Sequence, residues 1–232
     1  MTETGKPMRI AVIGATGRLG SRVAREALAR GHKVTAISPK SSDFKGEHMH
    51  GFEKATHVVA DLDDPFSIAH AITDHDAVVS AVRNKNLGPG THFLRDTAQT
   101  LLTVLPEAGV DRLIFLGGGA SLLDGTGHPA SEAPWFPVEF EDDAREHAEA
   151  LAFLRAADTP VEWSYSSPSV VNFVDGPDTG AYRAEARDTM YPDLNPRSEL
   201  STGDYATAIV DALETGSFIR QRFAVGPRVL GV

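Results

Sequence analysis

The chain has 232 residues, of which 41% are hydrophobic and 23% are charged, a profile typical of a globular protein that buries a large core. It contains no cysteine, which excludes a disulfide framework and a thiolate nucleophile, and its formal net charge of −10 disfavours nucleic acid as a partner. No apolar run approaches the roughly 20 residues that cross a bilayer, so we expect no membrane partner and a cytoplasmic location.

Strand and helix signals alternate through the first half of the chain. Because parallel strands need crossover connections, this alternation predicts a doubly wound parallel α/β sheet with helices on both faces. Short β-branched and apolar runs predict strands at 9–14, 33–38, 57–60, 77–82 and 112–116, and apolar residues at helical spacing predict helices at 19–30, 65–73 and 91–108.

The second half is less regular. A helix over 141–157 and a strand over 161–166 are predicted, and Ser201 is typical of an N-cap for a helix that ends near 213. A last strand is predicted at 223–225. We expect one domain over residues 1–232, with irregular segments that cover the substrate side of the sheet at about 123–140 and 172–200.

A glycine-rich loop lies between the first predicted strand and the first helix. In a Rossmann unit one glycine permits the tight turn, one lets the backbone approach a pyrophosphate, and one allows close helix–strand packing. The helix N-terminus then binds the pyrophosphate of NAD(P)(H). The alternative is that these glycines serve only turn and packing. The predicted cofactor-binding residues of this loop are Gly14, Ala15, Thr16, Gly17, Arg18, Leu19 and Gly20.

The end of the second predicted strand bears on the choice of nucleotide. NAD-specific sites commonly place an acidic residue there, whereas NADP sites place a cation for the 2′-phosphate. Here the strand ends at Ser38, Lys40 follows, and no acid is present. Together with Arg18, this favours NADP(H) over NAD(H); the alternative is that either cation is a solvated surface group.

Nine histidines invite a metal reading, and His48 and His50 are the most suggestive pair. A catalytic zinc site normally needs three protein ligands, and no further ligand accompanies these two. We therefore interpret them as part of a solvated loop and predict no metal.

The Gly-x-x-Gly-x-x-Gly spacing resembles the atypical short-chain dehydrogenase/reductase superfamily. The runs 10–20, 31–37 and 117–122 are similar to those of its NmrA-like putative NADH-flavin reductase family, and similarity continues to 201–206. The resemblance implies that Asp61 and Leu62 contact adenine, with a turn cap as the alternative for Asp61. It places five further residues along the cofactor, namely Ser80, Ala81, Val82, Gly117 and Gly118.

The resemblance also shows what this sequence lacks. Most short-chain dehydrogenases use a Tyr-x-x-x-Lys pair and a nearby Ser, whereas alignment places Asp143, His147 and Gly118 at those positions. An ionised aspartate cannot act as a phenolic acid and glycine has no hydroxyl, which argues against ordinary alcohol–ketone chemistry. His147 becomes the candidate ribose ligand or proton relay, with a plain surface role as the alternative.

Hydride transfer from NAD(P)H to a flavin, quinone or similar conjugated small molecule asks less of the protein, and FMN or FAD is among the expected acceptors. The alternatives are a non-catalytic NAD(P)-binding regulator of the NmrA type and an isomerase or dehydratase with bound nucleotide. We expect a monomer or homodimer. His147 and Ser121 are the candidate catalytic residues, and the candidate substrate-binding residues are Trp135, Phe136, Ser169 and Tyr182. Trp163 and Tyr165 are expected in the core, and Asp204 and Tyr205 in structural roles.

Overall fold

The structure, a computed structural model, describes residues 6–44, 51–84, 88, 90–169, 172–195 and 198–228. His48 and His50 lie outside these ranges. Within them, no group of three or more metal-ligating side chains is found, and no helix is both long and apolar enough to span a membrane.

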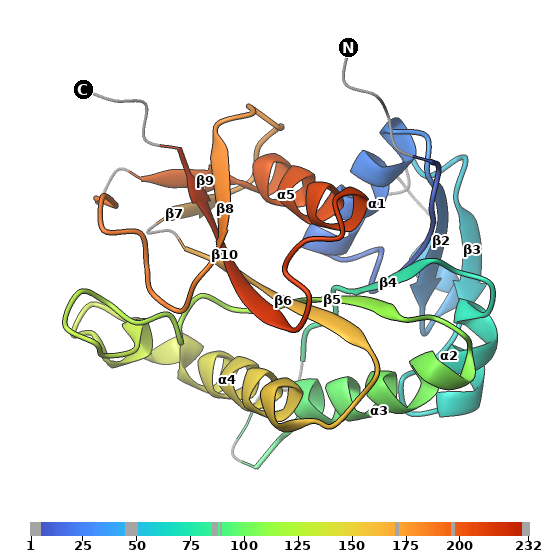
Figure 1. Cartoon of the computed structure of the whole chain (residues 1–232), viewed down its shortest axis with the longest axis horizontal. Coiled ribbons are helices and arrows are strands. Elements are labelled where there is room, and N and C mark those ends of the chain that lie inside the picture. The colour runs from blue at the N-terminus through green and yellow to red at the C-terminus, as the bar shows by residue number, and fades with distance from the viewer. Residues whose placement is uncertain are drawn as a thin grey trace.

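The centre of the fold is an eight-stranded sheet in the described part of the chain, in the order β3-β2-β1-β4-β5-β6-β10-β8 (Figure 1). All neighbouring strands are parallel except β8, which is antiparallel to β10. This confirms the predicted α/β class, since the order of β3 through β6 is that of a Rossmann sheet. The strands are β1 (Arg9–Ile13), β2 (Lys33–Ser38), β3 (Thr56–Val59), β4 (Ala77–Ser80), β5 (Arg112–Leu116), β6 (Glu162–Pro168), β8 (Tyr182–Ala186) and β10 (Gln221–Pro227).

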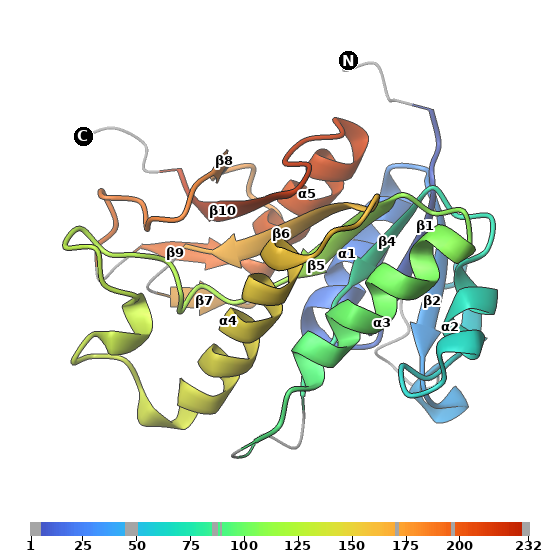
Figure 2. The same ribbon diagram turned by 60° about the horizontal axis from the view of Figure 1, so that its bottom comes forward.

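Among the residues that the structure describes, five α-helices are found, and they cover the two faces of this sheet (Figure 2). One apolar cluster joins α1 and α5 to one face through residues such as Val12, Val23 and Ile209. The other joins α2, α3 and α4 to the opposite face through residues such as Val78 and Leu101. The helices are α1 (Arg18–Ala29), α2 (Pro65–Ile72), α3 (Phe93–Glu107), α4 (Glu141–Ala156) and α5 (Thr202–Glu214), and short 3₁₀ turns are η1 (Ser41–Phe44), η3 (Ala130–Glu132) and η4 (Val138–Phe140).

Two helix starts follow from side-chain caps. Asp64 accepts hydrogen bonds from the amides of Phe66 and Ser67, and Pro65 occupies the first helical position of α2. Ser201 accepts from the amide of Asp204 and begins α5, as predicted. Both caps satisfy amide groups that have no partner within the helix.

The prediction of an irregular segment over 172–200 is wrong in part. It contains β8 and the two parallel strands of a small second sheet, β7 (Asn172–Val174) and β9 (Glu199–Ser201). Strand β10 is also longer than the predicted 223–225. Strands β7, β8 and β9 each pair with a strand distant in sequence. The local alternation of apolar residues that predicts a strand is weak in three-residue strands such as β7 and β9 and in β8 at the half-exposed edge of the sheet.

Candidate active site

The glycine-rich loop runs from the end of β1 into α1 and ends at the carboxyl edge of the sheet. The Gly17 amide donates to the Gly14 carbonyl oxygen at 3.0 Å, which closes the turn. Gly17 is the N-cap of α1 and provides no side-chain cap, and the first turn holds no acidic residue. The amides of that first turn and the positive end of the helix dipole therefore suit a bound anion.

Two glycines of this loop are required by close backbone approaches. Gly14 has φ +78°, and a Cβ there would lie 2.8 Å from the carbonyl oxygen of Ala81 at the end of β4. A Cβ on Gly20 would lie 2.2 Å from the Gly14 carbonyl oxygen, and one on Gly17 would lie 3.2 Å from the same atom. The loop is thus a tight backbone cradle of the kind that a pyrophosphate fits.

Between these glycines, Ala15 is fully buried, Leu19 packs against the core, and Thr16 is half-buried. Arg18 has a partner that sequence reasoning missed. Its Nε donates to Oδ1 of Asp175 at 2.8 Å, and its Nη2 donates to the Phe173 carbonyl oxygen at 3.1 Å. The charge of Arg18 is therefore compensated, and the glycine-rich loop is joined to β7 and to the residue that follows it.

The ends of β2 and β3 carry the residues expected near the adenosine half. Ser38 is buried and Lys40 is exposed just beyond β2. The Asp61 carboxylate accepts from the Asp63 amide at 3.1 Å, which is the turn-cap role. Leu62 is half-buried against the core on the α2 side. Contacts of these residues with adenine or a 2′-phosphate stay predictions.

The end of β4 lies against the glycine-rich loop. The Ala81 amide donates to the Ile13 carbonyl oxygen at 2.9 Å, which continues the β1–β4 pairing, and Val82 packs against the α3 side of the core. Ser80 is fully buried, and its hydroxyl has no hydrogen-bond partner among the residues that the structure describes. Of this predicted trio, Ala81 makes the closest approach to the cradle.

The end of β5 brings together two residues that sequence comparison singled out. A Cβ on Gly118 would lie 3.0 Å from the imidazole ring of His147, so the ring occupies the space in which a larger side chain would lie. Gly117 lies against the ring of Tyr165, because a Cβ on Gly117 would lie only 2.0 Å from the Cζ atom of that ring. The Gly118 amide donates to the Tyr165 hydroxyl at 3.2 Å. Gly117 and Gly118 therefore pack directly against a tyrosine ring and a histidine ring.

Tyr165 and His147 form a compact buried pair. The Tyr165 hydroxyl donates to the His147 carbonyl oxygen at 2.9 Å and lies 3.3 Å from its Nδ1. Tyr165 is in the core as predicted, yet its hydroxyl contacts the candidate catalytic residue, a role that the sequence did not reveal. Burial raises the pKa of this hydroxyl, so it stays protonated at neutral pH.

Burial also determines the charge of His147, whose side chain is 14% exposed. It lowers the pKa of the imidazole from 6.5, and the nearby Asp143 acts in the opposite direction without reversing the shift. The Asp143 carboxylate lies 3.9 Å from His147 Nε2 and 3.6 Å from Arg83 Nε. At neutral pH His147 is therefore an uncharged hydrogen-bonding group.

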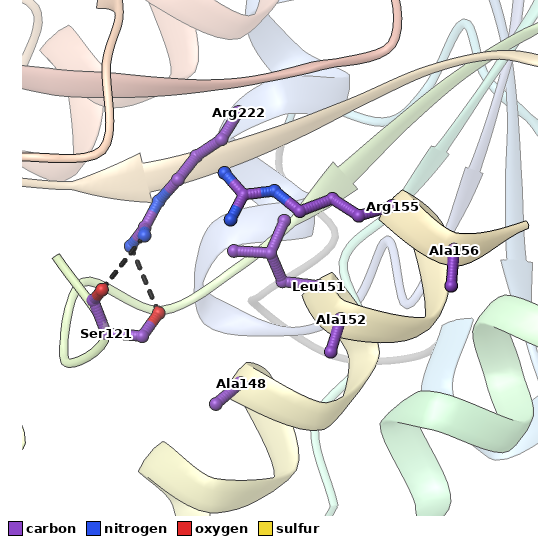
Figure 3. A pocket seen from close by; sticks show the side chains of 7 residues that line it. All are labelled: Ser121, Ala148, Leu151, Ala152, Arg155, Ala156 and Arg222. Carbon is purple, nitrogen blue, oxygen red and sulfur yellow. Dashed lines mark hydrogen bonds between the residues drawn. The ribbon is translucent and has the colours of Figure 1, made fainter.

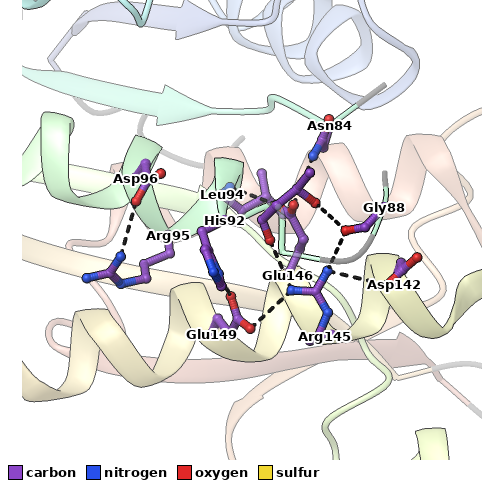
Figure 4. A network of polar contacts seen from close by, with 11 residues as sticks. Asn84, Gly88, His92, Leu94, Arg95, Asp96, Asp142, Arg145, Glu146 and Glu149 are labelled. Atoms are coloured by element: carbon purple, nitrogen blue, oxygen red, sulfur yellow. Dashed lines mark hydrogen bonds and ion pairs between the residues drawn. The ribbon is translucent and has the colours of Figure 1, made fainter. Parts of the chain in front are cut away.

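A polar network fixes α4, and with it His147, against α3 (Figure 4). The fully buried Glu146 accepts from the Leu94 amide and from Asn84 Nδ2, both at 2.9 Å. Next to it, Arg145 donates to the Gly88 carbonyl oxygen and to Glu149. Sequence reasoning missed Glu146, although an acidic residue on the buried face of a helix is the available signal.

The remaining candidates are placed less close to one another. Ser121 is bound by Arg222, which donates to its carbonyl oxygen at 3.0 Å and to its hydroxyl at 3.2 Å. Ser169 is fully buried and accepts from the Tyr191 amide. Trp135 is 61% exposed before α4, with Phe136 beside it.

Tyr182 is the candidate whose expected setting the structure corrects. It belongs to β8 rather than to an irregular segment, packs against the core on the α5 side, and donates its hydroxyl to Asp211 of α5. The structure thus brings Gly118 and His147 together but gives Ser121, Ser169 and Tyr182 partners of their own. Asp204 is structural as predicted, since it accepts from the Thr179 and Gly180 amides.

Comparison with known proteins agrees with this geometry. An uncharacterized protein of Bacillus subtilis, YwnB, is 31% identical over 222 residues, which cover 94% of this chain and 98% of the relative. The crystal structure of SP1627, a putative NADH-flavin reductase from Streptococcus pneumoniae, is similar with a TM-score of 0.79 and 30% identity, covering 95% of this chain and 99% of that one. A putative epimerase from Bacteroides thetaiotaomicron is similar with a TM-score of 0.82 and 28% identity, covering 98% and 100%.

The sheet order and the glycine cradle define a Rossmann-type dinucleotide-binding protein. The family model described as NAD(P)H-binding matches residues 14–215, and the chain belongs to this family. This confirms the resemblance to the atypical short-chain dehydrogenases that the sequence indicated.

Proposed function

We propose that the protein is an NAD(P)H-dependent reductase that transfers hydride to a flavin, quinone or similar conjugated acceptor. The observation that carries this proposal is the contact of Gly118 with the His147 ring at the end of β5. This corner offers an uncharged imidazole and no serine hydroxyl or lysine at the matched positions. A conjugated acceptor suits such a site, because its ring system spreads the incoming charge and solvent delivers the proton.

In this proposal the chain's residues bind and orient rather than transfer protons. The first-turn amides of α1 bind the pyrophosphate. Gly117 and Gly118 make room for the rings of Tyr165 and His147 at the end of β5, beside which the nicotinamide is proposed to bind. The reduced nicotinamide, when bound, supplies the hydride. His147, positioned by Tyr165 and Glu146, donates or accepts one hydrogen bond at the ribose or the acceptor while remaining uncharged. Trp135 and Phe136 are proposed to stack on the flat acceptor.

NADP(H) is proposed as the preferred nucleotide. Lys40 supports this preference as an exposed cation just beyond β2, whereas the ion pair of Arg18 with Asp175 weakens it. The cytoplasmic location and the monomeric or homodimeric state stay predictions.

The experiment that tests the proposal is a titration of the purified protein with NADPH and NADH, followed by nicotinamide oxidation with FMN, menadione and biliverdin as acceptors. Binding with turnover of at least one acceptor supports a reductase and ranks its substrates. Absence of nicotinamide binding refutes the whole assignment.

A second candidate is a non-catalytic regulator that binds NAD(P). The same uncharged, buried His147 favours it, since burial lowers the pKa of this imidazole and leaves it a poor acid–base group near neutral pH. Tight binding of NADPH without turnover of any of the three acceptors would select this candidate.

A further inference from the structure

A second polar feature lies away from the glycine cradle, between α4 and β10. A cavity of about 470 Å³ opens there, with two arginines at one end and one helix face as its wall (Figure 3). Ala148, Ala152 and Ala156 recur at intervals of four residues, so their methyl groups line one side of α4. The full lining is Ser121, Ala148, Leu151, Ala152, Arg155, Ala156 and Arg222.

Arg222 is a buried cation at this cavity, with a side chain only 2% exposed. Its hydrogen bonds to described residues go to uncharged oxygens, from Nε to the Ser167 hydroxyl at 2.9 Å and from the two Nη atoms to Ser121. Burying a charge is costly unless it is paired. The nearest carboxylate is that of Asp188, 3.7 Å from Nη1.

Arg155 and Arg222 converge on that one carboxylate. Arg155 Nη2 donates to the same Oδ1 of Asp188 that faces Arg222, and both Arg155 and Asp188 are about half exposed. The two guanidinium groups therefore already define an anion position, which an exposed side chain of the chain itself occupies.

Positive charge extends beyond this pair. A second cavity of about 340 Å³ shares Arg155 and Arg222 with the first and is also lined by Arg187 and Arg220. Four arginines and one aspartate thus line the two cavities within the described residues, in a chain whose net charge is −10. Such local segregation of charge attracts anions from solution.

We propose that the α4–β10 cavity binds a small organic anion, a carboxylate or a phosphate monoester. The anionic group lies between Arg155 and Arg222, and the apolar body lies on the alanine face of α4. Asp188 is the internal competitor that the ligand displaces. A volume of about 470 Å³ is within the range of small-molecule sites. The argument for this cavity does not rest on the proposed reductase function, although Ser167 links Arg222 to the Gly118 carbonyl oxygen.

The test is a titration of the isotopically labelled protein with phenyl phosphate and with benzoate, followed by amide chemical shifts in NMR spectra. Two matched probes serve as controls: phenol has the apolar ring but no charge, and inorganic phosphate has the charge but no apolar body. We expect saturable shifts at Ser121, Ala148 and Ala152, with tighter binding of both aryl anions than of phenol or inorganic phosphate. Shifts confined to residues 14–20 would place the anion at the glycine cradle and overturn the proposal.

Three variants sharpen the test. Arg155→Gln should weaken binding of the aryl anions about tenfold, because a charge-assisted hydrogen bond is lost. Arg95→Gln on α3 is the matched control, since its side chain is equally exposed (44% against 45%), and it should bind as the wild type does. Asp188→Asn should bind several-fold more tightly. Equal weakening by both arginine variants, or no gain from Asp188→Asn, would overturn the proposal.

Discussion

Replacing Gly20 with alanine tests whether the glycine cradle is the dinucleotide site. The new Cβ would lie 2.2 Å from the Gly14 carbonyl oxygen and 2.8 Å from its carbon, whereas ordinary contacts begin at 3.4 Å. Both obstructing atoms are backbone, so the loop or the first turn of α1 must move by about 1 Å. Forced overpacking of this kind costs about 1–3 kcal/mol.

That cost predicts two measurable losses. The melting temperature should fall by about 2–12 °C, since 1 kcal/mol corresponds to roughly 2–4 °C in a protein of this size. The displaced first-turn amides should also weaken NADPH binding, measured by calorimetry or nicotinamide fluorescence, by about tenfold or more. Gly17→Ala should have a smaller effect on stability, because its Cβ would lie 3.2 Å from the Gly14 carbonyl oxygen.

Gly125→Ala is the matched control, because a Cβ at that position meets nothing within 4 Å. It should leave both the melting temperature and NADPH affinity unchanged. If Gly20→Ala loses stability but keeps full NADPH affinity, the cradle is a packing device and the cofactor lies elsewhere.

Three further predictions concern single contacts. Burial alone would raise the pKa of Glu146, but hydrogen bonds from Thr91, Asn84 and backbone amides outweigh burial and lower the pKa below 4.5. The stability that these hydrogen bonds provide is therefore present above pH 4.5 and is lost as the pH falls through the lowered pKa. The Glu146→Gln variant should therefore melt about 2–12 °C lower than the wild type at neutral pH, and its melting temperature should depend less on pH. Identical melting curves of the two proteins, both at about pH 7 and below about pH 4, would contradict this. Asp175→Asn should raise the affinity for NADPH relative to NADH about two- to fivefold by releasing Arg18, and an unchanged ratio of dissociation constants would show that Arg18 does not face the 2′-phosphate. Tyr165→Phe should lower the melting temperature by about 1–6 °C and reduce kcat more than it changes KM, because His147 loses the hydroxyl that positions it; unaltered kcat would assign the hydroxyl to packing alone.

Local sequence patterns were sufficient for the parallel part of the fold. Strands such as β4 and β5 are short apolar runs that are buried on both faces, and α1 carries its buried residues at helical spacing. The glycine cradle was predictable for the same reason, because the turn and the close approaches are specified within a few residues. The Ser201 cap is equally local.

The contacts that sequence reasoning missed join distant residues. Arg18 pairs with Asp175, and Arg222 with Ser121, across 157 and 101 residues of sequence respectively. Neither pair leaves a periodic or compositional signal, because the first depends on the fold placing β7 beside the glycine-rich loop and the second on β10 joining the main sheet. Arg18 consequently looked like a cation available to a cofactor, and Ser121 looked like a catalytic hydroxyl.

The helix α4 explains how one element serves two sites. Successive residues of an α-helix point about 100° apart, so Glu146, His147 and Ala148 face three different surroundings. Glu146 contacts the start of α3, His147 contacts Gly118, and Ala148 lines the proposed anion cavity. A change that shifts α4, such as loss of the Glu146 hydrogen bonds, should therefore disturb both sites together. Loss of Asp188 or Asp175, which lie outside α4, should alter one site and leave the other intact.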